Sequence, residues 1–285
     1  PTYASIGVAA PILLVLLRFV QGLAIGGQWG GAMLLVTESA PADQRGWYGA
    51  YAQAGAPLGV VLANLAFIGV SSSMSDEAFM DWGWRLPFIA SIVLIGISMY
   101  IQLKIEDTEA FRSLSDAQSA TDKPAETVKR SPVIEAIRKY PKRIMLAAGA
   151  FLSVQVTFYI LIAFVISYGM QSPDLMLSKD LMLTAVLVAA AIMVPTQFYF
   201  SGLSDRIGRK NVYRWGAILT GAWGFALFPL IDTGNPLFIC LAITMGLLFL
   251  GMQYGPQAAY FTELFSTEVR YSGASLGYQL GAIIG

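Results

Sequence analysis

The sequence contains no histidine and a single cysteine, Cys240, which lies within an apolar run. Histidine is the usual general base and metal ligand near neutral pH, so its absence disfavours hydrolytic and metal-dependent catalysis. One cysteine excludes an internal disulfide and leaves no cysteine cluster for a metal. We therefore expect no cofactor and no metal. Lys and Arg total 18, as do Asp and Glu, and we expect no nucleic-acid partner.

Charged residues are also scarce, because they form 13% of the chain where an ordinary soluble domain has roughly 25%. Hydrophobic residues form 56%, and the mean hydropathy is +0.61. A bilayer core is crossed by about 20 mostly apolar helical residues. The buried core of a large soluble protein is the alternative, but these runs lack its alternation of faces. We predict an all-α, polytopic membrane bundle with apolar segments at 1–37, 48–75, 86–103, 144–173, 181–204, 215–231, 233–262 and 271–285.

Basic residues concentrate in every second connection between these segments. Apart from Arg18, Arg85 and Lys179, every Lys and Arg follows the first, third, fifth or seventh segment. Cytoplasmic loops of membrane proteins carry the excess of basic residues. We therefore expect these connections, including 104–143, to be cytoplasmic.

A stretch of the chain occurs twice, since residues 26–45 and 251–270 align at a constant offset of 225. The copies lie in the first and seventh segments, six apart, so they run in the same direction and predict a parallel repeat of two six-helix bundles. We expect residues 1–103 to hold spans 4–6 of a twelve-span protein, and 144–285 to hold spans 7–10 and the start of span 11. Residues 104–143 form the linker between them. Identical positions in the copies include Gly26 and Gly251, Gln28 and Gln253, Gly30 and Gly255, Thr37 and Thr262, Glu38 and Glu263, and Arg45 and Arg270.

Polar side chains within the apolar segments are the candidates for a transport pathway. An Arg at the centre of a span costs about 2.5–3.5 kcal/mol on insertion scales, so Arg18 is expected to face a partner or a wet cavity. On one continuous helix, Arg18, Gln21 and Gln28 would share a face. Each of these residues has a structural alternative, as an ion pair or a hydrogen bond to a neighbouring helix. The predicted substrate and proton pathway residues are Arg18, Gln21, Gln28, Gln53, Gln155, Tyr159, Gln253 and Gln257.

A charged cluster stands at 201–210, SGLSDRIGRK, between two apolar segments. Decoration of a cytoplasmic loop is the simple explanation, and a latch that stabilises one conformation is the functional one. We expect Glu38 with Arg45, and Glu263 with Arg270, to act as similar latches. Exposed ion pairs contribute about 0–1 kcal/mol each, which biases two states without fixing one. The predicted cytoplasmic gate residues are Asp205, Arg206, Gly208, Arg209, Lys210, Glu38, Arg45, Glu263 and Arg270.

Two further patterns predict packing and membrane contact. Gly22, Gly26 and Gly30 recur every four residues, a spacing that lets helices approach closely. Residues 131–140 predict a short amphipathic helix with Val133 and Ile137 on one side and basic residues on the other. We expect this helix to lie at the cytoplasmic lipid surface.

Several motifs resemble one known family. SGLSDRIGRK is similar to the loop signature G-x-L-x-D-R-x-G-R-K of the major facilitator superfamily, with Ser201 replacing the first Gly. RFVQG at 18–22 is similar to its R-x-x-Q-G pattern. More narrowly, GGQWGGA at 26–32, WRLPF at 84–88, EDTEAF at 106–111 and ELFSTEVRYSGASLGYQL at 263–280 resemble the metabolite:proton symporter family.

This resemblance implies a monomeric symporter of the bacterial inner membrane that takes up a small organic acid or zwitterion with protons, by alternating access. The sequence departs from the family at Gln28, where a Glu is expected and where Gln cannot titrate. The alternatives are a uniporter or a drug/proton antiporter of the same fold. From another class, a receptor or membrane enzyme remains, but an enzyme would need clustered His, Cys or carboxylates at membrane depth.

Overall fold

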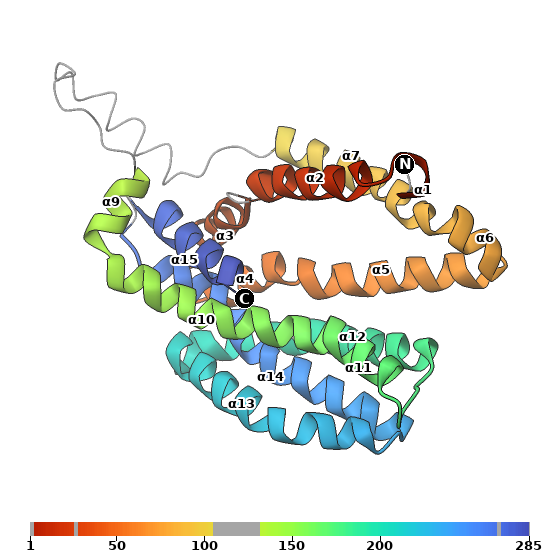
Figure 1. Ribbon diagram of the computed structural model, residues 1–285. Helices are drawn as coiled ribbons and strands as arrows, with labels where there is room; N and C mark the ends of the chain where they lie inside the picture. Colours follow the sequence, from red (N-terminus) through yellow and green to blue (C-terminus); the bar gives the residue numbers. More distant parts are fainter. Residues whose placement is uncertain (1–2, 26–27, 105–131, 267–268, 285) are drawn as a thin grey trace.

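The computed structural model describes residues 3–25, 28–104, 132–266 and 269–284. These residues form helices joined by short turns, with no strand among them, which confirms the predicted all-α class (Figure 1). The helices are α1 (Tyr3–Ile6), α2 (Ala9–Ile25), α3 (Gln28–Ser39), α4 (Arg45–Gln53), α5 (Gly55–Ser72), α6 (Asp76–Asp81), η1 (Gly83–Arg85), α7 (Leu86–Lys104), α9 (Pro132–Lys139), α10 (Pro141–Tyr159), η2 (Ile160–Phe164), α11 (Val165–Gln171), α12 (Lys179–Ile207), α13 (Arg209–Asp232), α14 (Pro236–Glu263) and α15 (Arg270–Ile284).

Within the described residues, six helical stretches are long and apolar enough to cross a membrane. Their ends follow local chemistry. Ser178 caps α12 by accepting a hydrogen bond from the Leu181 amide, and Asn235 caps α14 in the same way through the Leu237 amide. Gly208 joins α12 to α13 at φ 92°, a backbone conformation that favours glycine. The six stretches are Arg45–Ser72, Gly83–Ile101, Pro141–Gln171, Lys179–Ile207, Arg209–Asp232 and Pro236–Glu263.

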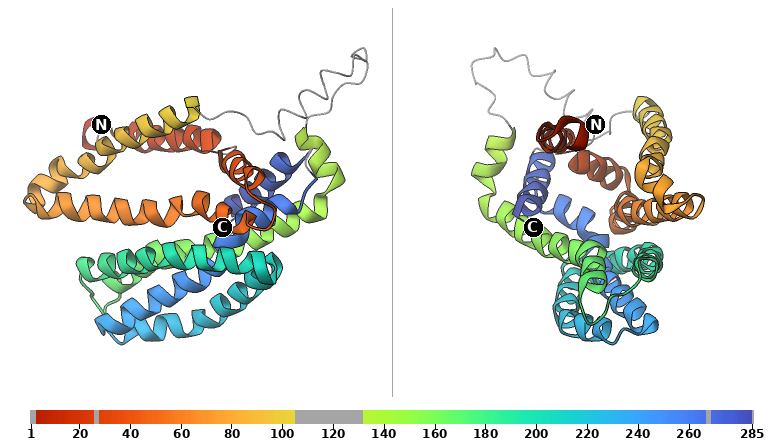
Figure 2. Two further views of the ribbon diagram at one scale, coloured as in Figure 1. Left: turned by 180° about the vertical axis from the view of Figure 1, so that it is seen from behind. Right: turned by 45° about the vertical axis from the view of Figure 1, so that its right-hand side comes forward.

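The first apolar segment departs from its prediction, because it is not one helix. α2 ends at Ile25 and α3 begins at Gln28. Residues 26–27 lie outside the described residues, and α2 and α3 run in different directions (Figures 1 and 2). A wheel drawn for one straight helix therefore does not place Arg18 and Gln28 on one face.

Of the glycines predicted to pack closely in this segment, Gly30 has a close neighbour on another helix and Gly22 has none. A Cβ on Gly22 would meet nothing within 4 Å, whereas one on Gly30 would collide with Ser275 of α15. Gly26 lies outside the described residues. The large apolar side chains of α2, such as Leu14 and Leu17, are exposed, a surface that suits hydrocarbon.

We call α1 to α7 the first part of the chain and α9 to α15 the second part, and the second part holds the main core. α14 packs along both α12 and α13, and α10 packs along α15. Phe151, Leu161, Met182, Met193 and Phe261 are all essentially inaccessible in this core. The helices of the first part approach it through a narrow contact. α4 packs against α12 and α14, α5 against α12, and α3 against α14 and α15 (Figures 1 and 2).

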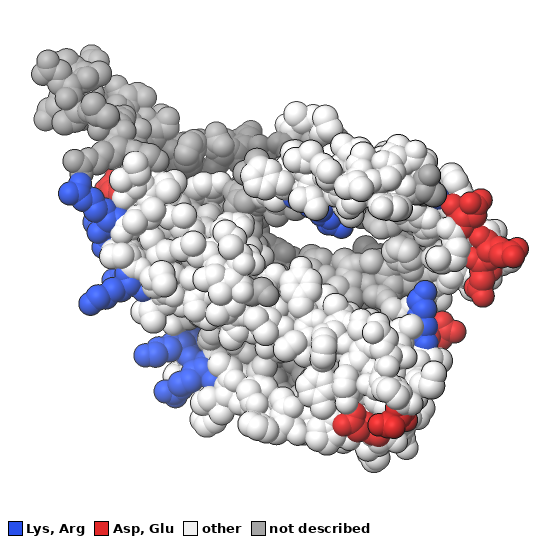
Figure 3. Space-filling model, in the orientation of Figure 1, with Lys and Arg blue, Asp and Glu red and all other residues white. Residues whose placement is uncertain are grey.

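Most of the visible Lys and Arg side chains gather at one end of the bundle, and most of the visible Asp and Glu side chains gather at the other (Figure 3). Arg45, Arg143, Arg209, Arg214 and Arg270 start or flank helices at one end, which we call the basic end. The opposite end carries Asp76, Glu77, Asp81, Asp174, Asp180 and Asp232 and is called the acidic end. This distribution fits the predicted alternation of basic connections.

The close packing of the core can be tested at Gly246. A Cβ on Gly246 of α14 would lie 2.7 Å from Cδ2 of Leu161, which is 1% exposed and has nowhere to move. Overpacking of this kind costs about 1–3 kcal/mol. We expect Gly246→Leu to lower the melting temperature in detergent by several degrees. Gly221→Leu, at an open position of α13, is the matched control. Equal melting temperatures for the two variants would contradict this packing.

Candidate functional site

The centre of the candidate site is the carboxylate of Asp205. It belongs to α12 in the second part of the chain and contacts the first turn of α4 in the first part. Asp205, in the last turn of α12, accepts hydrogen bonds from the backbone amides of Gly46 and Trp47, both at 2.9 Å. These amides belong to the first turn of α4, where helical N–H groups lack intrahelical partners and the helix dipole is positive. A negative charge there both caps α4 and ties it to α12.

Arg209 holds this carboxylate in place. Its guanidinium forms an ion pair with Asp205, donates to Ser204 Oγ at 3.1 Å, and pairs with Glu263 at 3.1 Å. The Asp205 and Arg209 side chains are only 7% and 12% exposed, while Glu263 is 36% exposed. The Asp205–Arg209 pair is thus shielded from water, where charge-assisted hydrogen bonds are strongest. The arrangement joins the end of α12, the start of α13 and the end of α14.

An ion pair also joins the two parts of the chain, since Arg270 of α15 meets Glu38 of α3 at 3.2 Å. The sequence predicted pairing within each copy, Glu38 with Arg45 and Glu263 with Arg270. The structure instead pairs Glu38 with Arg270 and Glu263 with Arg209. Docking explains the first pair, because it brings Glu38 of α3 to Arg270 of α15. The second pair joins the neighbouring helices α13 and α14 of one part, where Arg209 lies closer to Glu263 than the sequence pattern indicated.

Small residues let the backbones approach closely beside these charges. A Cβ on Gly46 would lie 2.6 Å from the carbonyl oxygen of Ser201 in α12. A Cβ on Gly49 would lie 3.3 Å from the Cβ of Ala258 in α14. Larger side chains at either position would force α4 away. Of the remaining predicted gate residues, Arg206 and Lys210 are exposed, Arg45 is half-buried, and Gly208 forms the α12–α13 turn.

An amide and aromatic layer lies on the inner side of this charged contact. The Trp29 indole donates to Gln53 Oε1 at 3.1 Å, and the Gln53 amide donates to the Tyr254 carbonyl at 2.9 Å. The Trp29 ring stacks on Tyr278 with centroids 4.2 Å apart, and Tyr278 stacks on Phe151 at 4.0 Å. Residues of α3 and α4 are thereby joined to α14, α15 and α10.

The predicted pathway residues of the second part lie outside this layer. Gln253 accepts from Ser153 and donates to Thr220, so it joins α10, α14 and α13 within the same part. Gln257 is fully buried, and its amide atoms have no hydrogen-bond partner within the described part of the chain. Gln155 is half-buried and Tyr159 is 52% exposed.

The predicted pathway residues of α2 and α3 lie apart from this layer. Arg18 is exposed and donates to Gln21 at 3.2 Å within the same helix. Gln28, at the first position of α3, is also exposed. Of the predicted pathway residues, the structure therefore brings Gln53 alone into the Trp29–Tyr278 layer.

A cavity opens at the acidic end, between α5 and α6 of the first part and α12 of the second. It has a volume of about 550 Å³ and is lined by both aromatic and charged side chains. The Lys179 ammonium lies 5.9 Å from the Phe79 ring centroid across it. Its lining residues are Ala63, Asn64, Phe67, Ile68, Ser71, Ser72, Asp76, Phe79, Lys179, Asp180 and Leu183.

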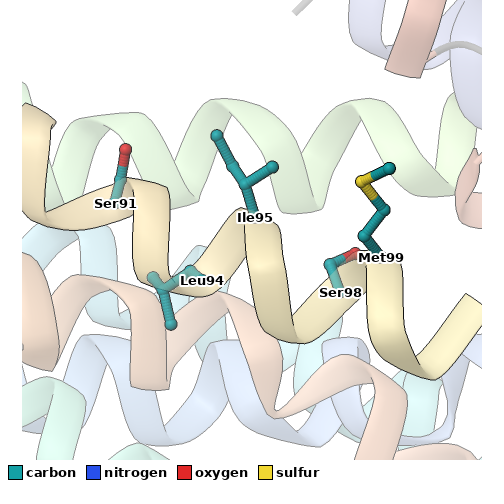
Figure 4. Close-up of a pocket in the computed structure, with 5 residues that line it drawn as sticks. All are labelled: Ser91, Leu94, Ile95, Ser98 and Met99. Atoms are coloured by element: carbon teal, nitrogen blue, oxygen red, sulfur yellow. The ribbon is translucent and has the colours of Figure 1, made fainter.

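A second depression, of about 360 Å³, follows α7. Figure 4 shows that the residues lining it all come from this one helix, and none is charged. Leu94 and Ile95 make most of this surface apolar, so it offers no set of converging polar groups for recognition of a solute.

The comparisons with known proteins now decide the family. The family model described as Major Facilitator Superfamily matches residues 2–285. The chain belongs to the major facilitator superfamily. With its six apolar spans, this superfamily member is a multi-pass membrane protein.

Its relatives carry transport names. The chain is 38% identical to a putative metabolite transport protein of Haemophilus influenzae, over all of the chain and 64% of that protein. It is 34% identical to the shikimate transporter of Escherichia coli over the same shares, and 31% identical to the proline/betaine transporter of Salmonella typhimurium over 57% of that protein. The chain thus spans under two thirds of the length of these relatives. They are transporters rather than enzymes.

Sequence reasoning about this superfamily member missed Trp29, Tyr278 and Phe151. One signal was present. Trp29 and Tyr254 are equivalent in the repeat, and Gln53 and Tyr278 stand at the same offset of 225. Residues equivalent in a parallel repeat lie on opposite sides of its interface, so this offset could have indicated that the four residues meet.

Asp205→Asn tests the charged contact. The substitution removes the ion pair with Arg209 and one of the two oxygens that accept from the α4 amides. Each hydrogen bond to a charged group contributes about 1.5–3 kcal/mol to stability. We expect the basic end to open about tenfold more often. The reporter is the maleimide reaction rate of Ala50→Cys, at a fully buried α4 position, in a Cys240→Ala background.

Two controls accompany this measurement. Arg214→Gln removes an exposed charge from the same end and should leave the rate unchanged. Ala189→Cys, buried within the second part, should stay unreactive in all variants, which excludes general unfolding. A rate for Asp205→Asn equal to that of the parent would remove Asp205 from the closure.

Trp29 offers a graded test of the aromatic layer. Trp29→Phe removes the N–H donated to Gln53 but keeps a ring for stacking, at a cost of about 1 kcal/mol. Trp29→Leu removes both, and the lost aromatic pair adds about 0.5–1.5 kcal/mol. The Ala50→Cys reporter should therefore react faster in Trp29→Leu than in Trp29→Phe. The control is Trp82→Leu, an exposed position at the acidic end. A faster reaction in Trp29→Phe than in Trp29→Leu would contradict a role for stacking.

Proposed function

We propose that this protein is a secondary active transporter that takes up a small organic acid or zwitterion by alternating access, with protons as the coupling ion. We place it in the bacterial inner membrane with its basic end in the cytoplasm. The observation that carries the proposal is the asymmetry of the contact between the two parts. They are joined at the basic end and separated by a cavity at the acidic end.

This asymmetry is what one state of an alternating-access cycle requires. A solute enters from the acidic end while the basic end is shut, and the reverse arrangement releases it. In the proposed division, residues 1–103 and 144–285 belong to two bundles that rock against each other, joined by 104–143. The contact at the basic end is the part that must break in each cycle.

The chemistry of that contact suits repeated breaking. It consists of the Glu38–Arg270 ion pair, two amide hydrogen bonds to Asp205, the Gln53 bonds and a few small-residue contacts. Its residues gain alternative partners from water when they separate, so the net cost of opening is much smaller than the sum of the bonds. Two states within a few kcal/mol of each other are what a coupled solute can interconvert.

The proposed solute class comes from the relatives and from Arg18. The relatives are named for metabolites, for shikimate and for proline or betaine, all of them small organic molecules. Arg18 is an exposed cation within an apolar helix, and a guanidinium donates two parallel hydrogen bonds to a carboxylate. We propose Arg18 as the carboxylate-binding residue and Gln28 as a further pathway residue.

Uptake measurements test the function as a whole. Cells that express the intact protein are given a labelled panel of organic acids, proline and betaine, with and without a protonophore. We expect at least one solute to accumulate, and accumulation to collapse with the protonophore. Accumulation that resists the protonophore would indicate another coupling ion, and equilibration without accumulation would indicate a uniporter. Absence of uptake for every solute, with normal membrane insertion, would contradict the proposed substrate class.

Arg18 is tested by charge and by shape separately. We expect Arg18→Ala to abolish uptake because the solute carboxylate loses its partner, a loss of about 2–5 kcal/mol. Arg18→Lys should keep part of the activity with a raised KM, since the charge remains and the two-pronged geometry is lost. The matched control is Arg214→Gln. Wild-type uptake by Arg18→Ala would remove Arg18 from the mechanism.

A further inference from the structure

α9 (Pro132–Lys139) is an amphipathic helix that the transport cycle leaves without a role. Its Ala136 is fully buried against a small cluster that includes Ile144, Phe265 and Ala274. This contact fixes the rotation of α9 about its axis, because one side must face α15 and α10. The directions of its other side chains then follow from helical geometry.

The side next to the buried one is aliphatic and uncovered. Val133, Ile134 and Ile137 fall within about 100° of the helix circumference, and they are 41%, 55% and 50% exposed. Three adjoining aliphatic side chains on so short a helix form a face that water solvates poorly. At the end of a bundle of membrane-spanning helices, the material available to cover such a face is lipid.

The remaining side of α9 and the turn after it are basic. Arg138, Lys139, Lys142 and Arg143 follow one another within six positions, and Glu135 is the single acidic residue in 132–143. Lys142 and Arg143 stand in the first turn of α10, where a positive charge opposes the helix dipole. Helix stability therefore does not explain them.

Tyr140 organises this basic group. The Arg143 guanidinium lies 5.0 Å and the Lys139 ammonium 5.8 Å from its ring centroid. Arg143 also donates to the Leu264 carbonyl, which ties the turn to the end of α14. Arg138 and Lys142 are exposed on either side of it. Figures 1 and 2 show α9 running across the basic end of the bundle rather than along the direction of α10.

We propose that α9 and the turn into α10 form a docking surface for anionic phospholipid. Val133, Ile134 and Ile137 insert at the boundary of the acyl chains, while Arg138 and Lys142 contact the phosphate groups of the lipid. Charge complementarity selects the occupant, because an amphipathic helix with a basic polar face binds anionic bilayers more strongly than neutral ones.

Spin labels at two neighbouring positions test the insertion. Ile134→Cys and Glu135→Cys are made in the Cys240→Ala background, and the intact protein is placed in nanodiscs of phosphatidylglycerol and phosphatidylcholine. We expect the label at 134 to be reached by oxygen and shielded from a water-soluble nickel chelate. The label at 135 should show the opposite. Equal exposure of both labels to the chelate would overturn the proposal.

Charge removal tests the choice of lipid. In the parent protein, replacing phosphatidylglycerol by phosphatidylcholine should raise the chelate accessibility of the label at 134. Arg138→Gln with Lys142→Gln should abolish that lipid-dependent shift, whereas Lys104→Gln with Arg214→Gln should retain it. A shift that persists in the first pair, or one that is absent from the parent, would refute anionic-lipid docking. Gel-filtration profiles show whether each variant is folded, and none of these readouts depends on transport.

Discussion

The arrangement of the two parts depends on one interaction, the Asp205 carboxylate on the first turn of α4. A helix start has unpaired N–H groups and a positive dipole, and here the negative charge that satisfies them comes from the other part of the chain. Arg209 aligns the Asp205 carboxylate and also forms an ion pair with Glu263. Removing this single charge leaves α4 uncapped and the guanidinium half-neutralised.

The remaining contacts between the parts lie around the Asp205 carboxylate, and they depend on the close approach of α4 to α12 and α14. Gly46 and Gly49 leave no side chain between α4 and its neighbours, so the amides reach Asp205. Trp29 and Gln53 then lie close enough to Tyr278 and Tyr254 to stack and to hydrogen-bond. Each contact is modest, and each is lost when the helices separate by a few ångströms. A contact with these properties has two states, closed and open, rather than a continuous range of positions.

The sequence predicted the fold well because length and composition decide it. The described residues of each apolar segment are mostly helical. Ser178 and Asn235 cap the starts of α12 and α14, and Gly208 ends α12. Of the predicted gate residues, Asp205 and Arg209 lie at the contact between the parts, and Glu38 pairs with Arg270 instead of Arg45. Partner choice depends on how the parts dock, which no local pattern encodes. The Trp29–Tyr278 stack was missed for the same reason.

The most direct measurement uses a position where α4 packs closely against α14. Gly49 and Ala258 are replaced by cysteine in the Cys240→Ala background, since a Cβ on Gly49 would lie 3.3 Å from that of Ala258, near disulfide range. If the contact at the basic end opens and closes during transport, the disulfide forms readily, stops uptake, and is reversed by reductant. Uptake that continues at the full rate with the disulfide formed would show that these helices never separate during the cycle.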